Sequence, residues 1–277
     1  MSIDPELETQ YNARAAVPEH VDILEDWKRR SEALRARLPC RLDLAYAEGA
    51  RCRVDLFTVE PAGAPLHVYL HGGYWQRGER REFHFVAEGL CAHGVNVALV
   101  GYDLCPAVPI DAIVDQARRA LAWLWRNADA LGFDAGRIQV CGHSAGGHLA
   151  AMLMATRWPE VDADLPDEPI QSGLAISGLY ALEPLVRTSI NEAVGMSAAD
   201  ARRASPALLP RSARAPLALA VGECESAEFH RQARLLAERW PGAGMLEVPG
   251  ANHFTVVESL AAGGVLLERA LALIGRA

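Results

Sequence analysis

Short apolar runs alternate along the chain with segments in which apolar residues recur at helical spacing. Strands that alternate with helices are typical of a mostly parallel sheet with helices on both faces. The pattern therefore predicts an α/β fold. The apolar runs predict strands near residues 66–71, 95–101, 137–142, 172–178, 216–222 and 243–249.

Three segments depart from this alternation. Residues 40–60 hold two alternating stretches, which predict an antiparallel hairpin at the start of the sheet. Residues 1–37 predict an N-terminal helical segment, and the proline-containing residues 180–210 predict an irregular helical insertion that caps the site. Because neither a repeat nor a low-complexity linker interrupts the chain, we expect residues 1–277 to form a single domain with a large core.

The pentapeptide GHSAG at 142–146 directly follows one predicted strand and opens a helical stretch over 147–156. A serine in a sharp turn between a strand and a helix is typical of a nucleophile elbow. Glycines flank such a serine because side chains there would collide with the neighbouring strand and helix. The sequence therefore predicts that Ser144 is a nucleophile.

A second motif, HGGYW at 71–75, also follows a predicted strand. The amides of Gly72 and Gly73, together with the amide of Ala145, are expected to form an oxyanion hole. Tyr74 stands where such loops often have a third glycine, and Trp75 follows it. We expect both rings to contact substrate and to leave room for a short acyl group only, with plain core packing as the alternative.

In this arrangement an acid follows a later strand, and a histidine follows the acid. His253 lies in the loop after residues 243–249 and is the expected general base. Glu225 is the expected acid because it lies three residues past the strand end at 222, deep enough in the loop to turn back toward the histidine. Glu223 is the alternative acid. Glu228 is expected in the first turn of a helix, where a carboxylate complements the dipole.

Four motifs together resemble the kynurenine formamidase (arylformamidase) group of the α/β-hydrolase superfamily, which is related to the hormone-sensitive-lipase-like esterases. They are HGGYW at 71–75, GHSAGGH at 142–148, ECESAEF at 223–229 and ANHF at 251–254. The resemblance implies an α/β-hydrolase fold with a catalytic triad in which Ser144 is the nucleophile. It also implies His253 as general base, and Gly72, Gly73 and Ala145 as oxyanion donors.

The group usually has aspartate where this chain has Glu225, and glutamate also serves in α/β-hydrolase triads. The resemblance implies a serine hydrolase that cleaves an N-formyl aryl amide or a short-chain acyl ester. Two alternatives remain: a general carboxylesterase, and a non-catalytic binding protein on the same fold. The presence of both Ser144 and His253 argues against the binding protein.

Charge and composition narrow the expected partners to a small-molecule substrate. With 27 basic and 35 acidic residues the net charge is −8, and the chain has no basic run, which argues against nucleic acid and anionic membranes as partners. The early charges and the lack of a long apolar run lead us to expect a soluble, cytoplasmic protein. The pattern does not indicate an oligomeric state.

The potential metal-binding and redox residues do not form a recognisable site in the sequence. The six cysteines show no C-x-x-C spacing, so we expect mostly buried reduced thiols, with Cys224 beside the presumed acid as the exception. His67 and His71 lie four residues apart on a strand, so they do not share the face that a helical H-x-x-x-H metal site requires. We therefore expect neither a metal nor another cofactor.

Overall fold

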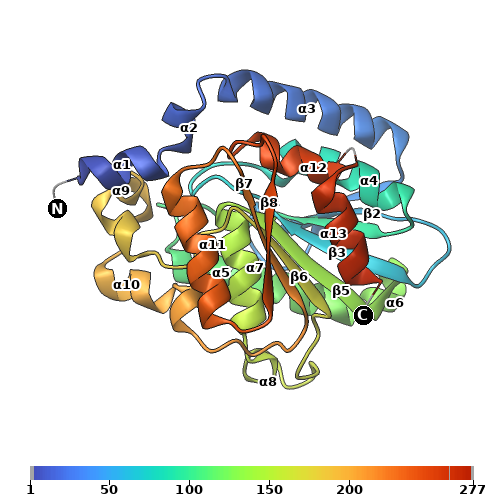
Figure 1. Cartoon of the computed structure of the whole chain (residues 1–277). Coiled ribbons are helices and arrows are strands. Elements are labelled where there is room, and N and C mark those ends of the chain that lie inside the picture. Colours follow the sequence, from blue (N-terminus) through green and yellow to red (C-terminus); the bar gives the residue numbers. More distant parts are fainter. Residues whose placement is uncertain (1–2, 262, 276–277) are drawn as a thin grey trace.

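The computed structural model describes residues 3–261 and 263–275. Within them an eight-stranded sheet has the strand order β1-β2-β4-β3-β5-β6-β7-β8, as Figure 1 shows. The strands are β1 (Cys40–Ala45), β2 (Arg53–Phe57), β3 (Ala64–Leu70), β4 (Asn96–Val100), β5 (Phe133–His143), β6 (Ser172–Ile176), β7 (Leu217–Gly222) and β8 (Ala243–Val248).

Strands β3 to β8 run parallel to one another, and the predicted hairpin β1–β2 adds two antiparallel strands at one edge. Parallel strands need long crossover connections, and the helices between the strands supply them. All the parallel strands therefore end at the same edge of the sheet. The mostly parallel α/β sheet predicted from the apolar runs is confirmed.

Helices cover both faces of this sheet. The α-helices are α1 (Pro5–Tyr11), α2 (Ala13–Ala16), α3 (His20–Arg37), α4 (Ala87–Ala92), α5 (Ile110–Arg126), α6 (Ala128–Leu131), α7 (Ala145–Ala155), α8 (Trp158–Val161), α9 (Asn191–Val194), α10 (Ala198–Arg203), α11 (Ala227–Arg239), α12 (Glu258–Ala261) and α13 (Val265–Ile274). Short 3₁₀ helices are η1 (Arg80–Val86), η2 (Glu183–Arg187), η3 (Pro206–Leu208) and η4 (Thr255–Val257). Among the described residues no helix combines the length and the apolarity that a bilayer crossing requires.

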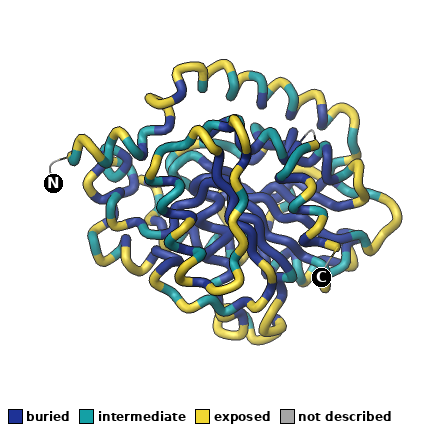
Figure 2. The backbone as a smooth tube through the Cα atoms, viewed as in Figure 1, coloured by how far each residue is buried: buried dark blue, intermediate teal, exposed yellow. Residues whose placement is uncertain are grey.

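The core consists of two apolar layers, one on each face of the sheet. Adjacent strand residues belong to different layers: Val68 is part of the layer that contains the buried residues of α5, α7 and α11, whereas Tyr69 is part of the layer that contains those of α3, α4 and α13. A strand that is buried on both faces reads as a continuous apolar run, which is why these strands could be predicted. Figure 2 shows the buried sheet between more exposed helices.

Helix α1 lies beside α9 of the insertion at 180–210, at one end of the molecule, as Figure 1 shows. Glu8 on α1 accepts hydrogen bonds from both the amide and the hydroxyl of Ser189, and Asp4 forms an ion pair with Arg187 at 2.9 Å. The insertion contains η2, α9, α10 and η3. These contacts fix α1 and α2 close to the carboxyl edge of the sheet.

Candidate active site

Ser144 occupies the sharp turn between β5 and α7. Its φ of 57° and ψ of −117° are unusual for a residue other than glycine, and such strain is often found at functional sites. A Cβ atom on Gly142 would lie 2.1 Å from the carbonyl oxygen of Gly146, and one on Gly146 would lie 1.9 Å from that of Leu70. Both glycines are therefore required by close backbone approach, as the elbow predicts.

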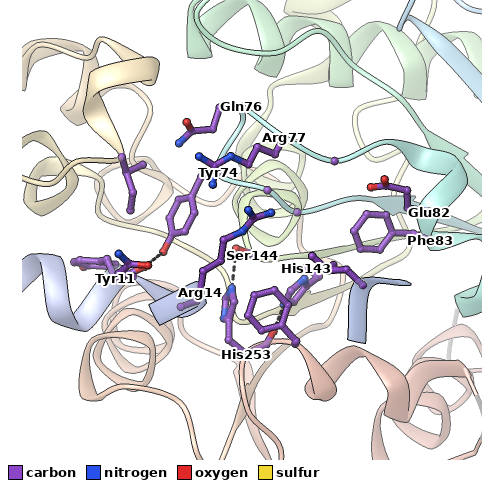
Figure 3. A pocket seen from close by; sticks show the side chains of 18 of the residues that line it. Tyr11, Arg14, Tyr74, Gln76, Arg77, Glu82, Phe83, His143, Ser144 and His253 are labelled. Carbon is purple, nitrogen blue, oxygen red and sulfur yellow. Dashed lines mark hydrogen bonds between the residues drawn. The ribbon is translucent and has the colours of Figure 1, made fainter. Parts of the chain in front are cut away.

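His253 lies in the loop between β8 and η4, and its ring faces Ser144. The distance between its Nε2 and the Ser144 Oγ is 3.0 Å, and its side chain is 7% exposed (Figure 3). The ring packs on Phe229, and His143 Nε2 donates to the His253 carbonyl oxygen at 2.8 Å. These contacts hold the imidazole in place next to the serine hydroxyl.

Glu225 completes the hydrogen-bonded line. Its Oε2 lies 2.6 Å from His253 Nδ1, while its Oε1 accepts from the Ser177 hydroxyl and from the Gly222 amide. Its side chain is fully buried. Burial by itself raises the pKa of this carboxyl, but the charge of His253 and the three hydrogen bonds outweigh it and lower the pKa. A carboxylate in this position fixes the imidazole tautomer and stabilises an imidazolium.

The other acidic residues of the same loop have different partners. Glu223 is exposed, and its Oε2 accepts from the Gly250 amide at 2.7 Å. Glu228 lies in the first turn of α11, as expected, but it also accepts from the Tyr11 hydroxyl and pairs with Arg231. Cys224 is an exposed free thiol. Of these loop residues, the structure brings Glu225 to His253.

The three predicted oxyanion donors surround the Ser144 turn. A Cβ atom on Gly72 would lie 3.1 Å from the Cβ atom of Ser144, and Gly73 has a φ of +117°, which favours glycine. Ala145 is the first residue of α7, so its amide is one of the unpaired amides at a helix start. None of the described residues accepts a hydrogen bond from the amides of Gly72, Gly73 or Ala145.

Tyr74 and Trp75 point in different directions. Both have positive φ angles, 52° and 57°, so the chain turns sharply between them. Tyr74 lines the cavity beside Ser144, and its hydroxyl donates to the Tyr11 carbonyl oxygen at 2.5 Å. Trp75 is fully buried in the core, where its Nε1 donates to His148 at 3.2 Å. The expectation that Trp75 contacts substrate was therefore wrong, because the turn directs its ring away from the cavity.

A cavity of about 250 Å³ opens beside Ser144. Its walls come from the N-terminal segment, the loop over residues 72–78, η1 and the insertion, and it includes His143, His253 and Phe254. Figure 3 shows Arg14, Tyr74 and Arg77 around the serine. The cavity has room for one small molecule with an aromatic ring.

His67 and His71 have structural partners. His67 Nδ1 lies 2.6 Å from the Gln139 side chain, and the His71 ring stacks between Phe83 and Tyr102. Burial lowers the pKa of His67 to about 4 and that of His71 to about 3, so both rings are neutral near pH 7. Across residues 3–261 and 263–275, no group of three or more histidine, cysteine or acidic side chains is placed to hold a metal ion.

Sequence reasoning missed three polar residues at this site. Ser177 follows β6 at the carboxyl edge of the sheet and donates to Glu225. Its place at the end of a predicted strand was the available signal. Arg14 and Arg77 line the cavity from α2 and from the loop after Tyr74. Arg14 ends the segment YNAR at 11–14, which also resembles the formamidase group and was the available signal, whereas nothing in the local pattern separates Arg77 from a surface arginine.

Comparisons with known proteins agree with the fold. A family model described as the alpha/beta hydrolase fold matches residues 67–245. The kynurenine formamidase of Salmo salar is 32% identical over 94% of this chain and 89% of its own length, and that of Danio rerio is 31% identical over 96% and 94%.

A solved structure gives the same result. The crystal structure of a thioesterase candidate from Silicibacter sp. TM1040 is 35% identical, with a TM-score of 0.87 over 98% of this chain and 99% of that chain. The solved structure and both relatives thus cover more than nine-tenths of this chain. The chain therefore belongs to the α/β-hydrolase family, and within that family to the group of the kynurenine formamidases.

Proposed function

We propose that this protein is a serine hydrolase that removes the formyl group from an N-formyl aryl amide of the N-formylkynurenine type. The observation that carries the proposal is the hydrogen-bonded line from Ser144 Oγ through His253 to Glu225, which ends at a cavity. The relatives named kynurenine formamidase supply the substrate class. Short-chain carboxylic esters are the second candidate, because the same groups can cleave them.

In the first half of the reaction, Ser144 Oγ attacks the formyl carbon while its proton passes to His253 Nε2. The amides of Gly72, Gly73 and Ala145 stabilise the negative charge that develops on the carbonyl oxygen. The C–N bond then breaks as His253 gives its proton to the departing aryl amine. An aryl amine leaves more readily than an alkyl amine, so this triad chemistry is adequate for the substrate.

In the second half, a water molecule attacks the formyl-serine ester while His253 Nε2 accepts a proton from that water. The resulting tetrahedral intermediate collapses, Ser144 recovers its proton from His253, and formic acid leaves and loses its proton to the solvent as formate. Glu225 keeps Nδ1 of His253 protonated throughout, so Nε2 remains the nitrogen that exchanges protons. This cycle consumes one water molecule and requires no other reactant.

Tyr74 supports the choice of a short acyl group. Its ring stands in the cavity wall beside the oxyanion loop, and its hydroxyl is fixed to the Tyr11 backbone. A ring held in this way cannot move aside easily for a long acyl chain. We infer that one or two acyl carbons fit and that longer chains fit poorly.

The test compares kcat/KM for N-formylkynurenine with kcat/KM for nitrophenyl esters of two to eight acyl carbons. We expect the formamide to be the best substrate and activity to fall with each lengthening of the acyl chain. Tyr74→Gly should improve long esters relative to short ones. A wild-type enzyme that prefers esters of any length over N-formylkynurenine would leave the esterase as the function, and equal losses on all chain lengths in the variant would make Tyr74 structural.

A further inference from the structure

Two arginines line the cavity that contains Ser144 and His253. Arg14 comes from α2, and Arg77 from the loop that follows Tyr74. Figure 3 shows the Arg14 side chain extending in front of Ser144 and the Arg77 side chain beside Tyr74. Elements that are 63 residues apart in sequence thus place two cations near one nucleophile. The proposed reaction steps use neither of them.

Neither arginine forms an ion pair with a carboxylate of the described residues. The acidic side chain in the cavity wall belongs to Glu82, whose Oε2 accepts from the Glu79 amide and whose Oε1 lies 3.9 Å from Lys28 Nζ. The acid of the site, Glu225, is enclosed by its own hydrogen bonds behind His253. Both arginines are exposed residues in the cavity wall, and their guanidinium groups have no carboxylate partner among the described residues, so their donors are available to a bound anion.

The two cations also act on each other. Burial, and then the positive charge of Arg77, lower the pKa of Arg14, while Glu82 raises it. Like charges in one partly buried cavity repel, and an anion between them would remove that repulsion. A guanidinium presents parallel donors that match the two oxygens of a carboxylate.

The chain as a whole carries a net charge of −8, so an anionic substrate meets an unfavourable overall field. Local cations at the cavity are therefore the groups that can select such a substrate. A formyl group has a single carbon and no place for a carboxylate. Any carboxylate on the substrate must then belong to the departing amine.

We propose that Arg14 and Arg77 bind a carboxylate carried by the leaving-group part of the substrate. This inference rests on the proposed function for the identity of the substrate, and it assigns the two residues that recognise the substrate carboxylate. The arginines would orient the aryl ring so that the formyl carbon lies at Ser144. They position the substrate and take no part in proton transfer.

The experiment uses matched substrates that differ in one charge. For wild type, Arg14→Gln, Arg77→Gln and the double variant, kcat/KM is measured with N-formylkynurenine and with its α-carboxamide, in which an uncharged amide replaces the carboxylate. We expect the ratio of the two values to fall about tenfold in each single variant and about a hundredfold in the double variant. Arg14→Lys should keep part of the preference because it retains the charge but loses the fork. Arg119→Gln, an exposed arginine on α5, is the control and should leave the ratio unchanged.

A second pair of substrates separates this inference from the proposed function. Nitrophenyl acetate and its ring-carboxylated derivative test the same arginines without a formamide. Wild-type preference for the carboxylated ester, lost in the double variant, supports the anion site even if N-formylkynurenine is not hydrolysed. If the charged-to-neutral ratio is the same in wild type and double variant for both pairs, with folding verified by circular dichroism, the inference is overturned.

Discussion

Among the described residues, two carboxylates are buried in contact with an imidazole, and one of these pairs borders the cavity beside Ser144. Asp55 Oδ2 lies 3.0 Å from His84 Nε2 between the sheet and η1, and Glu225 Oε2 lies 2.6 Å from His253 Nδ1 at the carboxyl edge of the sheet. The side chains of both acids are fully buried. Each acid accepts from one ring nitrogen, so each ring presents the lone pair of its other nitrogen to a third group.

The two pairs differ in the group that faces the free ring nitrogen of the histidine. The free nitrogen of His84 accepts from Arg35 at 3.3 Å, and a guanidinium does not give up a proton in proteins. The free nitrogen of His253 meets the Ser144 hydroxyl, whose proton can be transferred once a carbonyl is attacked. Asp55 also pairs with Arg80 at 3.1 Å, which makes its cluster a structural connection between η1 and the sheet. An acid and a histidine in contact thus indicate catalysis only when a nucleophile and space for substrate are present.

Removing the Ser144 hydroxyl, which faces the free nitrogen of His253, should have the largest effect on activity. Ser144→Ala is expected to lower kcat/KM by about 10⁵-fold or more, because the triad acts as a unit, while the protein stays folded. The measurement is formate release at high enzyme concentration, with thermal melting as the folding control. Activity above a few per cent of wild type would remove Ser144 from the mechanism.

Neutralising Glu225, the acid that is paired with His253, should lower activity by a smaller factor. Glu225→Gln is expected to lower kcat by about 10⁴-fold because the amide can hold His253 in the wrong tautomer. Glu223→Gln is the matched control from the same loop, and it should stay within about tenfold of wild type because surface changes are usually mild. The assignment fails if the control loses more activity than Glu225→Gln does. Glu225→Asp should be slower than wild type, since it withdraws the carboxylate from a loop built for glutamate.

The equivalent change in the Asp55–His84 pair should lower stability and leave catalysis unchanged. Asp55→Asn leaves Arg80 and Arg81 without a buried counter-charge and is expected to lower the free energy of unfolding by about 3 kcal/mol. Chemical denaturation measures that loss, and kcat per folded molecule should match wild type. A large fall in kcat at unchanged stability would contradict the separation of the two pairs.

Acid titration should show a smaller, graded effect from the buried histidines. Burial lowers the pKa of His143 to about 3 and that of His148 to about 4, so these rings stay neutral in the folded protein while they gain protons in the unfolded chain. Stability should therefore fall as pH decreases below about 6.5, by about 1.4 kcal/mol per pH unit for each such ring. The lowered pKa of Glu225 adds a further loss below its unfolded value near pH 4.3, because the bonded carboxylate must then be protonated.

Thermal melting between pH 7 and pH 4 measures this dependence. His67→Gln removes another buried ring, whose pKa burial lowers to about 4, and should reduce the slope, whereas His93→Gln at an exposed position is the matched control. A melting temperature that does not change between pH 6.5 and pH 5 would contradict this account of the buried rings.

The sequence alone determined the strands, the elbow and the order of the site residues. Apolar runs predict strands because a sheet covered on both faces buries every side chain. Glycines mark the elbow because a Cβ atom on Gly142 would lie only 2.1 Å from a backbone oxygen. Ser144 and His253 followed from motif and chain order. The sequence limited the candidates for the triad acid to one loop and favoured Glu225 over Glu223.

Tertiary structure decided where the loop side chains point. Glu225 reaches His253 because Ser177 and Gly222 hold its second oxygen, and Ser177 comes from a different strand. The Trp75 ring enters the core because two successive positive φ angles turn the chain, which no residue pattern signals. Arg14 and Arg77 line the same cavity because contacts of the N-terminal segment with residues 187–189 hold α2 beside it. Local spacing fixes periodic elements, but the direction of a loop side chain depends on partners far away in the sequence.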